Sequence, residues 1–343
     1  MASGIYTGSS TSVGYGFESG FKTGATINKT FGLNQKVGSL SLNTSQIILN
    51  KLGQVEPTKY AFGQQQGSVS VGFVFDDVES HNIFRCIYEN LTSSPAAESP
   101  TGTFHYPTSA VPAENQTGVL TPQTITTQVQ VNAGTSNVLT RTLKGCIVNS
   151  IGISTSIGEV VNGSVDMAFA EESTTNIAGS SFTTQDTINS ADLQPYTFAH
   201  GELLAPTGGG TLAEVSDVQD VDVTFNTNSE LLYGLGSQYA QNAFRKIFDI
   251  GGRFRTTFKD KTLLQYVIDQ SITGATSTAA ETFAETSSVG LALTFTNGNK
   301  SFKLEFGGVS LTDHSTSGLE PAEPVYEELN WKAKSSKITV DTV

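Results

Sequence analysis

The sequence is poor in the residues that carry most protein chemistry. It has two cysteines, Cys86 and Cys146, which lie far apart and outside any Cys-x-x-Cys or Cys/His spacing. This excludes a disulfide framework and a zinc site, so we expect both thiols to be buried as small apolar groups. The histidines share no His-Glu-x-x-His motif and have no close acidic partner. They are His81, His105, His200 and His314.

Long apolar runs and basic clusters are also missing. No apolar stretch reaches the length of about 18 residues that spans a membrane, and the first residues lack the basic and apolar regions of a signal peptide. The 19 basic residues are outnumbered by 32 acidic ones, which gives a formal net charge of −13. A surface that holds phosphate concentrates positive charge. We therefore expect no membrane partner, no export during synthesis and no tight binding of nucleic acid.

Catalytic motifs are absent as well. There is no Gly-x-Ser-x-Gly motif, and the glycine-rich run Pro206–Thr211 lacks the Gly-Lys-Ser/Thr ending that cradles phosphate, so we interpret it as a linker. Carboxylates occur at Glu171–Glu172, Glu323 and Glu327–Glu328, but adjacent carboxylates near strand ends are more typical of a solvated surface than of a glycosidase pair. The sequence predicts no enzyme activity, no cofactor and no metal site.

Alternation of apolar and polar residues, the pattern of a half-buried strand, dominates the chain. In the segment from 68 to 75, one face carries Val69, Val71, Phe73 and Phe75, while small residues take the other face. The pattern predicts a mainly β protein built from antiparallel sheet. The same pattern recurs in Gly163–Phe169, Asp220–Phe225, Leu291–Phe295 and, after an Asn297-Gly298 turn, Phe302–Phe306.

Two segments have the spacing of short helices. In Asp77–Tyr88 the residues Ile83, Phe84 and Ile87 share one face, and Asp260–Ile268 has a similar apolar face. Each predicted helix directly follows a strand. Segments rich in Ser, Thr, Pro and Asn are predicted as long loops, which either contact a neighbouring molecule or only cover the surface. These are Ser93–Pro122 and Ser173–Asp192.

The two halves of the sequence share an ordered set of features. Each half has the order strand, Leu-Gly loop, strand, helix, irregular stretch and two further strands. The ordered match predicts an internal duplication. At an offset of 183 residues (236 − 53), Asn43-Thr44 meets Asn226-Thr227, Leu52-Gly53 meets Leu235-Gly236, and Phe75-x-Asp77 meets Phe258-x-Asp260.

An ordered set of segments carries a resemblance to a known family. The first half has a Gly-x-x-Val-x-Ser strand followed by Gly-Glu-x-Val-x-Gly-Ser, and the second has a strand, an Asn-rich turn, a Gly-Ser loop and a helix start. The segments are Arg141–Ser150, Ser154–Val165, Val221–Glu230, Leu235–Ser237, Phe244–Phe258 and Lys259–Leu264. In this order they resemble the phage tail tube proteins, of the duplicated kind found in long-tailed phages and related viruses. The resemblance covers about 40–175 and 215–340, and it leaves out residues 1–40 and 90–135.

The resemblance implies both a fold and a function. The fold would be mainly β, with two tandem tail-tube-type β-sandwich or barrel units that each hold one short α-helix, over residues 1–195, with an N-terminal extension and a long loop, and 196–343. The function would be that of a structural virion protein, a tail tube subunit whose rings stack into a hollow tube that conducts viral DNA into the host. A trimeric ring of two-unit chains is favoured over a hexamer. Partners would be tape measure, tail terminator and baseplate or tip proteins, with assembly in the host cytoplasm.

A lumen that passes DNA without holding it favours carboxylates and neutral polar groups. By strand alternation, Asp166, Asp220 and Asp222 oppose the apolar faces of their strands, so they are candidates to face the lumen. The alternative is that the aspartates of the second half form cross-strand pairs with Arg253 and Arg255 on a nearby strand.

Stacking of rings requires a second contact surface. In tube proteins of this type a long loop between early strands makes that contact, which here implies Leu52–Gly67 and Leu235–Gly251. Aromatic side chains suit such an interface, although they also suit the core of the subunit itself. The candidates are Tyr60, Phe62, Tyr239 and Phe244.

Other classes of β protein share this composition. A β-sandwich adhesin or lectin would carry exposed Trp or Tyr platforms, and the single tryptophan, Trp331, lies in the strand-like segment Leu329–Lys332. A capsid or decoration protein of the virion is a further alternative. The shape of the assemblies would separate these alternatives from a tube.

Overall fold

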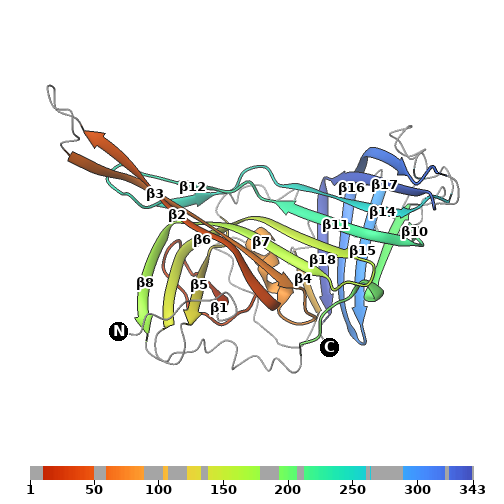
Figure 1. The fold of residues 1–343 in the computed structure, drawn as a ribbon, viewed down its shortest axis with the longest axis horizontal. Helices are drawn as coiled ribbons and strands as arrows, with labels where there is room; N and C mark the ends of the chain where they lie inside the picture. The colour runs from red at the N-terminus through yellow and green to blue at the C-terminus, as the bar shows by residue number, and fades with distance from the viewer. Residues whose placement is uncertain are drawn as a thin grey trace.

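The computed structural model shows a mainly β protein in which the strands join into one large antiparallel sheet (Figure 1). The expectation of a mainly β, antiparallel protein is therefore confirmed. The described residues are 11–49, 59–88, 103–106, 122–132, 138–177, 193–206, 212–259, 263, 289–320 and 324–341.

Eight strands form the central part of the sheet. Every neighbouring pair is antiparallel, and side chains alternate between an apolar face and a polar face. The segments predicted as strands from their alternation all lie in strands, either in this central part or in the flanking strands that pair with it. In spatial order the strands are β2 (Leu33–Leu49), β3 (Lys59–Val74), β7 (Asn162–Phe169), β6 (Val138–Ser156), β11 (Val218–Asn226), β14 (Asp249–Thr257), β17 (Tyr326–Ala333) and β16 (Lys300–Ser317).

The long strands β6 and β16 each leave the central part and continue into a flanking part. The first half of β6 pairs with β8 and β5, and the first half of β16 pairs with β18 and β15. Both strands change partners at a glycine with positive φ, Gly145 at 62° and Gly308 at 61°. The flanking strands are β1 (Thr11–Phe17), β5 (Ile125–Asn132) and β8 (Glu171–Ile177) on one side, and β4 (Thr103–Tyr106), β9 (Gly201–Pro206), β10 (Leu212–Glu214), β15 (Val289–Asn297) and β18 (Ser335–Asp341) on the other.

The same order of pairing occurs twice along the chain. The central order β2-β3-β7-β6 recurs as β11-β14-β17-β16, and the flanking order β8-β6-β5-β1 recurs as β18-β16-β15-β9. Single hydrogen bonds also recur: the Ala170 N–H donates to the Lys144 carbonyl at 3.1 Å, and the Lys334 N–H donates to the Gly307 carbonyl at 3.0 Å. The two sets of strands are joined within the chain by the antiparallel pair β6 and β11.

The apolar face of the central part packs against the flanking strands in one continuous core. Rings from both halves of the chain meet there, since the ring centroids of Phe75 and Phe302 are 4.7 Å apart. Within the second half, the centroids of Phe306 and Trp331 are 4.6 Å apart. Burial of each such ring stabilises the fold by roughly 1.5–3 kcal/mol. The expectation that both cysteines are buried is confirmed.

A short helical segment after β3 fills the space between the two sets of strands. It consists of the 3₁₀-helix η2 (Ser80–Phe84) and the single α-turn α1 (Arg85–Tyr88). Ile83, Phe84 and Ile87 are buried on its inner face, as predicted. The ring of Phe84 contacts Phe225 from the second half of the chain at 5.4 Å between centroids.

The helix is shorter than the predicted range 77–88. The carboxylate of Asp76 accepts hydrogen bonds from the N–H groups of Val78 and Glu79, at 2.8 and 2.6 Å, and from the hydroxyl of Ser80 at 2.6 Å. These bonds hold residues 76–79 in a turn, so the helix begins at Ser80. Of the second predicted helix, Asp260–Ile268, only Leu263 lies within the described residues.

Parts of the predicted loops are strands. The loop predicted at Ser93–Pro122 contains β4, which pairs with β18, and the first residues of the loop predicted at Ser173–Asp192 belong to β8. The pairing partner supplies the order here, because β4 has only four residues, too few to establish a period, and β8 is polar on both faces except at its last residue. Residues 11–40, outside the resemblance, supply β1 and the start of β2.

Candidate functional site

The polar face of the central part forms a continuous surface across eight strands. Cross-strand neighbours place small and polar side chains in rows, because residues opposite each other in a sheet point to the same side. One row runs Ser70, Asp166, Ser150, Asn226 and Asp249. Two further rows run Asn162, Ser154, Asp222, Arg253, Asn330 and Asp313, and Ser156, Asp220, Arg255, Glu328 and Ser315.

The three aspartates singled out from the sequence all lie on this polar face. Asp166 on β7 is exposed and accepts a hydrogen bond from the Ser150 hydroxyl at 2.8 Å. Asp220 and Asp222 on β11 are half-buried, and Asp222 accepts a bond of 3.4 Å from Thr224. Strand alternation therefore identified one common surface from two separate strands.

The alternative expectation concerned pairing of the β11 aspartates with arginines. The register places Asp220 opposite Arg255 and Asp222 opposite Arg253, as that alternative requires. However, Arg253 makes its ion pair with Glu328, at 3.5 Å, and the Arg255 guanidinium lies 4.5 Å from the centroid of the Tyr326 ring. The arginines are thus turned toward β17.

Three basic groups on the polar face are tied to neighbours on the same face. Besides the arginines, Lys332 forms an ion pair with Asp249 at 3.3 Å. Such partly exposed pairs contribute little to stability, about 0–1 kcal/mol each. Their effect on the surface is larger, because a cation that is already paired is a weaker site for phosphate. The face presents hydroxyls, amides and carboxylates in excess over free positive charge.

The segment predicted as the first stacking loop, Leu52–Gly67, is largely a strand. Residues from Lys59 onward belong to β3, and the paired ends of β2 and β3 project beyond the body of the molecule (Figure 1). Tyr60 and Phe62 lie in β3, opposite Ile48 and Gln46. Their side chains are not among those that the structure describes. Pairing with β2 orders this segment even though its polar run from 63 to 67 shows no apolar alternation.

The second predicted stacking segment, Leu235–Gly251, lies beside this hairpin. The Gln65 N–H of β3 donates to the Gln238 carbonyl at 2.9 Å, and the Tyr233 hydroxyl donates to the Gln65 carbonyl at 2.7 Å. Tyr239 and Phe244 are half-buried. Within the segment, β13 (Asn242–Phe244) pairs with β12 (Glu230–Leu232), which directly precedes the segment in the chain. The structure therefore brings the two predicted stacking segments together at one end of the molecule.

Two strand edges of the central part have no strand partner among the described residues. One is the outer edge of β2. The other is the outer edge of the second half of β16, Ser310–Ser317, on the side away from β17. An edge strand presents unpaired N–H and C=O groups and readily pairs with another chain. The sequence analysis missed both edges, because bulges interrupt their period-2 pattern.

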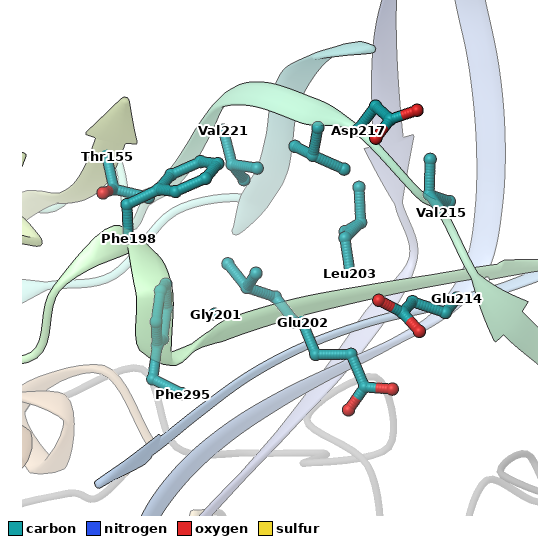
Figure 2. A pocket seen from close by; sticks show the side chains of 12 residues that line it. Thr155, Phe198, Gly201, Glu202, Leu203, Glu214, Val215, Asp217, Val221 and Phe295 are labelled. Atoms are coloured by element: carbon teal, nitrogen blue, oxygen red, sulfur yellow. The ribbon is translucent and has the colours of Figure 1, made fainter. Parts of the chain in front are cut away.

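A cavity of about 200 Å³ opens between β11 and the flanking strands β9 and β15 (Figure 2). Its floor is apolar, and carboxylates of Glu202, Glu214 and Asp217 stand at its rim. Asp217 is paired with Lys259 at 2.7 Å. Across the described residues, no group of three or more His, Cys, Asp or Glu side chains is arranged to hold a metal ion. The lining residues are Thr155, Phe198, Gly201, Glu202, Leu203, Glu214, Val215, Asp217, Val218, Val221, Leu293 and Phe295.

Two further observations bear on the alternatives. Trp331 is 2% exposed and packs in the core, so it is not the exposed platform that a lectin site would need. In the part of the chain that the structure describes, no helix is long and apolar enough to cross a membrane.

Comparison with known families decides between the remaining classes of β protein. A family model for the phage tail tube protein matches residues 8–333, which is nearly the whole chain. The chain belongs to the phage tail tube protein family. It is therefore a structural, non-enzymatic protein of the virion tail, and the resemblance stated from the sequence is confirmed. No curated protein matches the chain.

Proposed function

We propose that three copies of this tail tube subunit close into a ring and that the rings stack into a hollow tube, which conducts viral DNA into the host. The observation that carries the proposal is the internal joint between β6 and β11, which links two equivalent sets of strands edge to edge. The same joint, repeated between chains, closes a sheet on itself and removes its free edges.

The two sets of strands are proposed to be tandem tail-tube units, residues 1–195 and 196–343, each with one short helix. The recurring order of strand pairing supports this division, as do the matching glycines at Gly145 and Gly308. Three chains then supply six units to each ring. A ring of six chains would instead contain twelve units, which is why the trimer is favoured.

The polar face of the central part is proposed to line the lumen, with Asp166, Asp220 and Asp222 among the lining residues. Support comes from the balance of charge on that face, where the basic side chains of Arg253 and Lys332 are tied to carboxylates. DNA would pass such a wall without specific binding, because there is little free positive charge to hold phosphate.

The projecting β2–β3 hairpin and the adjacent segment Leu235–Gly251 are proposed to contact the next ring in the stack. The aromatic candidates Tyr60, Phe62, Tyr239 and Phe244 all belong to these two segments. Tape measure, tail terminator and baseplate or tip proteins are the expected partners at the ends and inside of the tube, with assembly in the host cytoplasm before release of the virion.

Electron microscopy of the purified, concentrated protein tests this function. Hollow tubes built from rings with three-fold symmetry are the expected result, and the wall of each ring should resolve into six similar units. Hollow tubes of six-chain rings would retain the conduit but reject the trimer. Protein that stays monomeric even with the other tail proteins present would reject the tube itself.

A further inference from the structure

The joint between β6 and β11 within the chain provides a template for the joint between neighbouring subunits. This inference rests on the proposed ring and adds to it the paired strands and their register. We propose that β2 of one subunit pairs antiparallel with the second half of β16 of the next subunit, with Asn43 placed opposite Asp313.

The position of β2 corresponds to that of β11. In the first set of strands Asn43 lies opposite Gln66 of β3, and in the second set Asn226 lies opposite Asp249 of β14. Gln66 and Asp249 are separated by the same 183 residues (249 − 66) as Asn43 and Asn226. The match holds from Ser39 to Asn43 and from Asp222 to Asn226, so Leu42 corresponds to Phe225.

The position of β16 corresponds to that of β6. Ser150 of β6 lies opposite Asp166 of β7, and Asp313 of β16 lies opposite Asn330 of β17. Both strands carry a register shift immediately before this residue, between Val148 and Ser150 and between Leu311 and Asp313. The shared irregularity fixes the correspondence of Ser150 with Asp313 without any adjustable offset.

Transfer of the internal joint then gives the intersubunit register. Within the chain, Asn226 lies opposite Ser150 and Phe225 lies opposite Ile151. Replacing each residue by its counterpart gives the predicted pairs between subunits, which are Ser39 with Ser317, Leu40 with Thr316, Ser41 with Ser315, Leu42 with His314, and Asn43 with Asp313.

The exposure of Leu42 fits this pairing. Leu42 is 44% exposed in the single chain, whereas its counterpart Phe225 is fully buried at the internal joint. Pairing with the next subunit places Leu42 beside His314, on the apolar side of the sheet, and removes its surface from water. The polar face continues across the joint through Asn43 and Asp313. A slip of one residue would turn Leu42 toward the polar face.

A threonine hydrogen bond at the internal joint has its own counterpart. The buried Thr227 donates its Oγ1–H to the Val148 carbonyl at 2.6 Å and its backbone N–H to the Asn149 carbonyl at 2.9 Å. The counterpart of Thr227 is Thr44. In the proposed register Thr44 donates to the carbonyls of Leu311 and Thr312 in the next subunit, at the bulge of β16.

Disulfide cross-linking of assembled protein tests the register. The Asn43→Cys/Asp313→Cys variant should form intersubunit disulfides under mild oxidation, and a non-reducing gel should show dimers and trimers that collapse to monomer with reductant. Ser39→Cys/Ser317→Cys supplies a second in-register pair. The matched control is Asn43→Cys/Ser315→Cys, which is displaced by two residues on the same face. Diagonal neighbours are about 7–8 Å apart, beyond the usual span of a disulfide.

The results of this experiment distinguish an incorrect register from an incorrect function. At least a tenfold higher yield of cross-linked trimer for both in-register pairs than for the control would support the proposal. Rings seen by electron microscopy together with efficient cross-linking only in the control would overturn the register and leave the ring standing. Absence of rings for the unmodified protein would instead overturn the proposed function. The native thiols of Cys86 and Cys146 are buried and do not compete.

Discussion

Gly145 and Gly308 occupy the same place in two different strands. Each has a positive φ, and each lies where its strand leaves a flanking part of the sheet and enters the central part. A Cβ at Gly145 would lie 3.0 Å from the Cβ of Ala170, and a Cβ at Gly308 would meet the Lys334 side chain at 2.8 Å. Both positions therefore favour glycine for conformation and for space.

Substitution at either glycine should destabilise the subunit. A left-handed conformation costs a non-glycine residue about 1–2 kcal/mol, and crowding adds to this, so we expect Gly145→Ala and Gly308→Ala each to lower the free energy of unfolding by about 2 kcal/mol. Urea denaturation of the unassembled protein measures the change. Gly72→Ala is the control, because its Cβ would meet nothing closer than 4.0 Å. Equal effects at all three positions would contradict the explanation.

Loss of a hydroxyl should have different effects at the two matching threonines. Thr227→Val leaves the Val148 carbonyl without its 2.6 Å hydrogen bond at the internal joint, and we expect the free energy of unfolding to fall by about 1–2 kcal/mol. Thr44→Val should leave the stability of the isolated subunit within about 0.5 kcal/mol of the original, because Thr44 lies on a free edge. Its effect should appear as about tenfold weaker ring formation, measured by analytical ultracentrifugation. A stability loss at Thr44 equal to that at Thr227 would argue against the correspondence.

The stability of the subunit should depend on pH through His81. Burial, together with the nearby charge of Lys29, lowers the pKa of His81 to about 3. The unfolded chain, with a pKa of about 6.5, takes up a proton that the folded chain does not. The free energy of unfolding should therefore fall as the pH falls from about 6.5 toward 3, by up to about 1.4 kcal/mol per pH unit.

The comparison with His81→Gln isolates this effect. Between pH 7 and pH 5 the original protein should lose about 2 kcal/mol more than the variant, measured by urea denaturation at each pH. Burial raises the pKa of Asp76, which acts in the opposite direction, but Asp76 is present in both proteins and cancels in the comparison. Parallel pH profiles for the two proteins would show that His81 takes up a proton as readily in the folded state as in the unfolded state, which would contradict the lowered pKa.

Charge reversal on the polar face should make assembled tubes bind DNA. The Asp166→Lys/Asp222→Lys variant adds free positive charge to the proposed lumen wall, and we expect retention of short DNA duplexes that weakens steeply with salt. The control is Glu202→Lys/Glu214→Lys, which changes the net charge equally at the rim of the cavity beside β9. Binding of DNA by both variants to the same extent would place the aspartates outside the lumen.

Alternation in the sequence predicted β3, β7 and β11 of the central part, together with β15 and the first half of β16. Val69, Val71 and Phe73 lie on one face of β3 and are buried by the rest of the chain. The alternation of apolar and small residues in the sequence therefore reveals the strand. The same rule placed Asp166, Asp220 and Asp222 on one polar face. It could not decide what the arginines on β14 contact, because the choice between Asp222 and Glu328 depends on side-chain direction across three strands.

Several strands were not predicted from the sequence, and not all of them lie at edges, since β5 pairs with both β1 and β6. Segment 63–67 of β3, with the sequence Gly-Gln-Gln-Gln-Gly, has no apolar side chain on either face and therefore shows no alternation. The offset of 183 residues between the two halves holds for the strands before the helix. After the helix the offset is 164 (329 − 165, from Val165 and Leu329), so an offset of 183 cannot match the later strands.

The pairing of β6 with β11 also bears on how a ring begins to form. Because a single polypeptide carries both strands, that joint closes at an effective concentration set by the chain and is unaffected by dilution. In the proposed trimer, half of the joints would thus be complete before any two subunits meet. Ring closure would become a three-body event, and its rate would fall far less steeply with dilution than that of a ring assembled from six separate units.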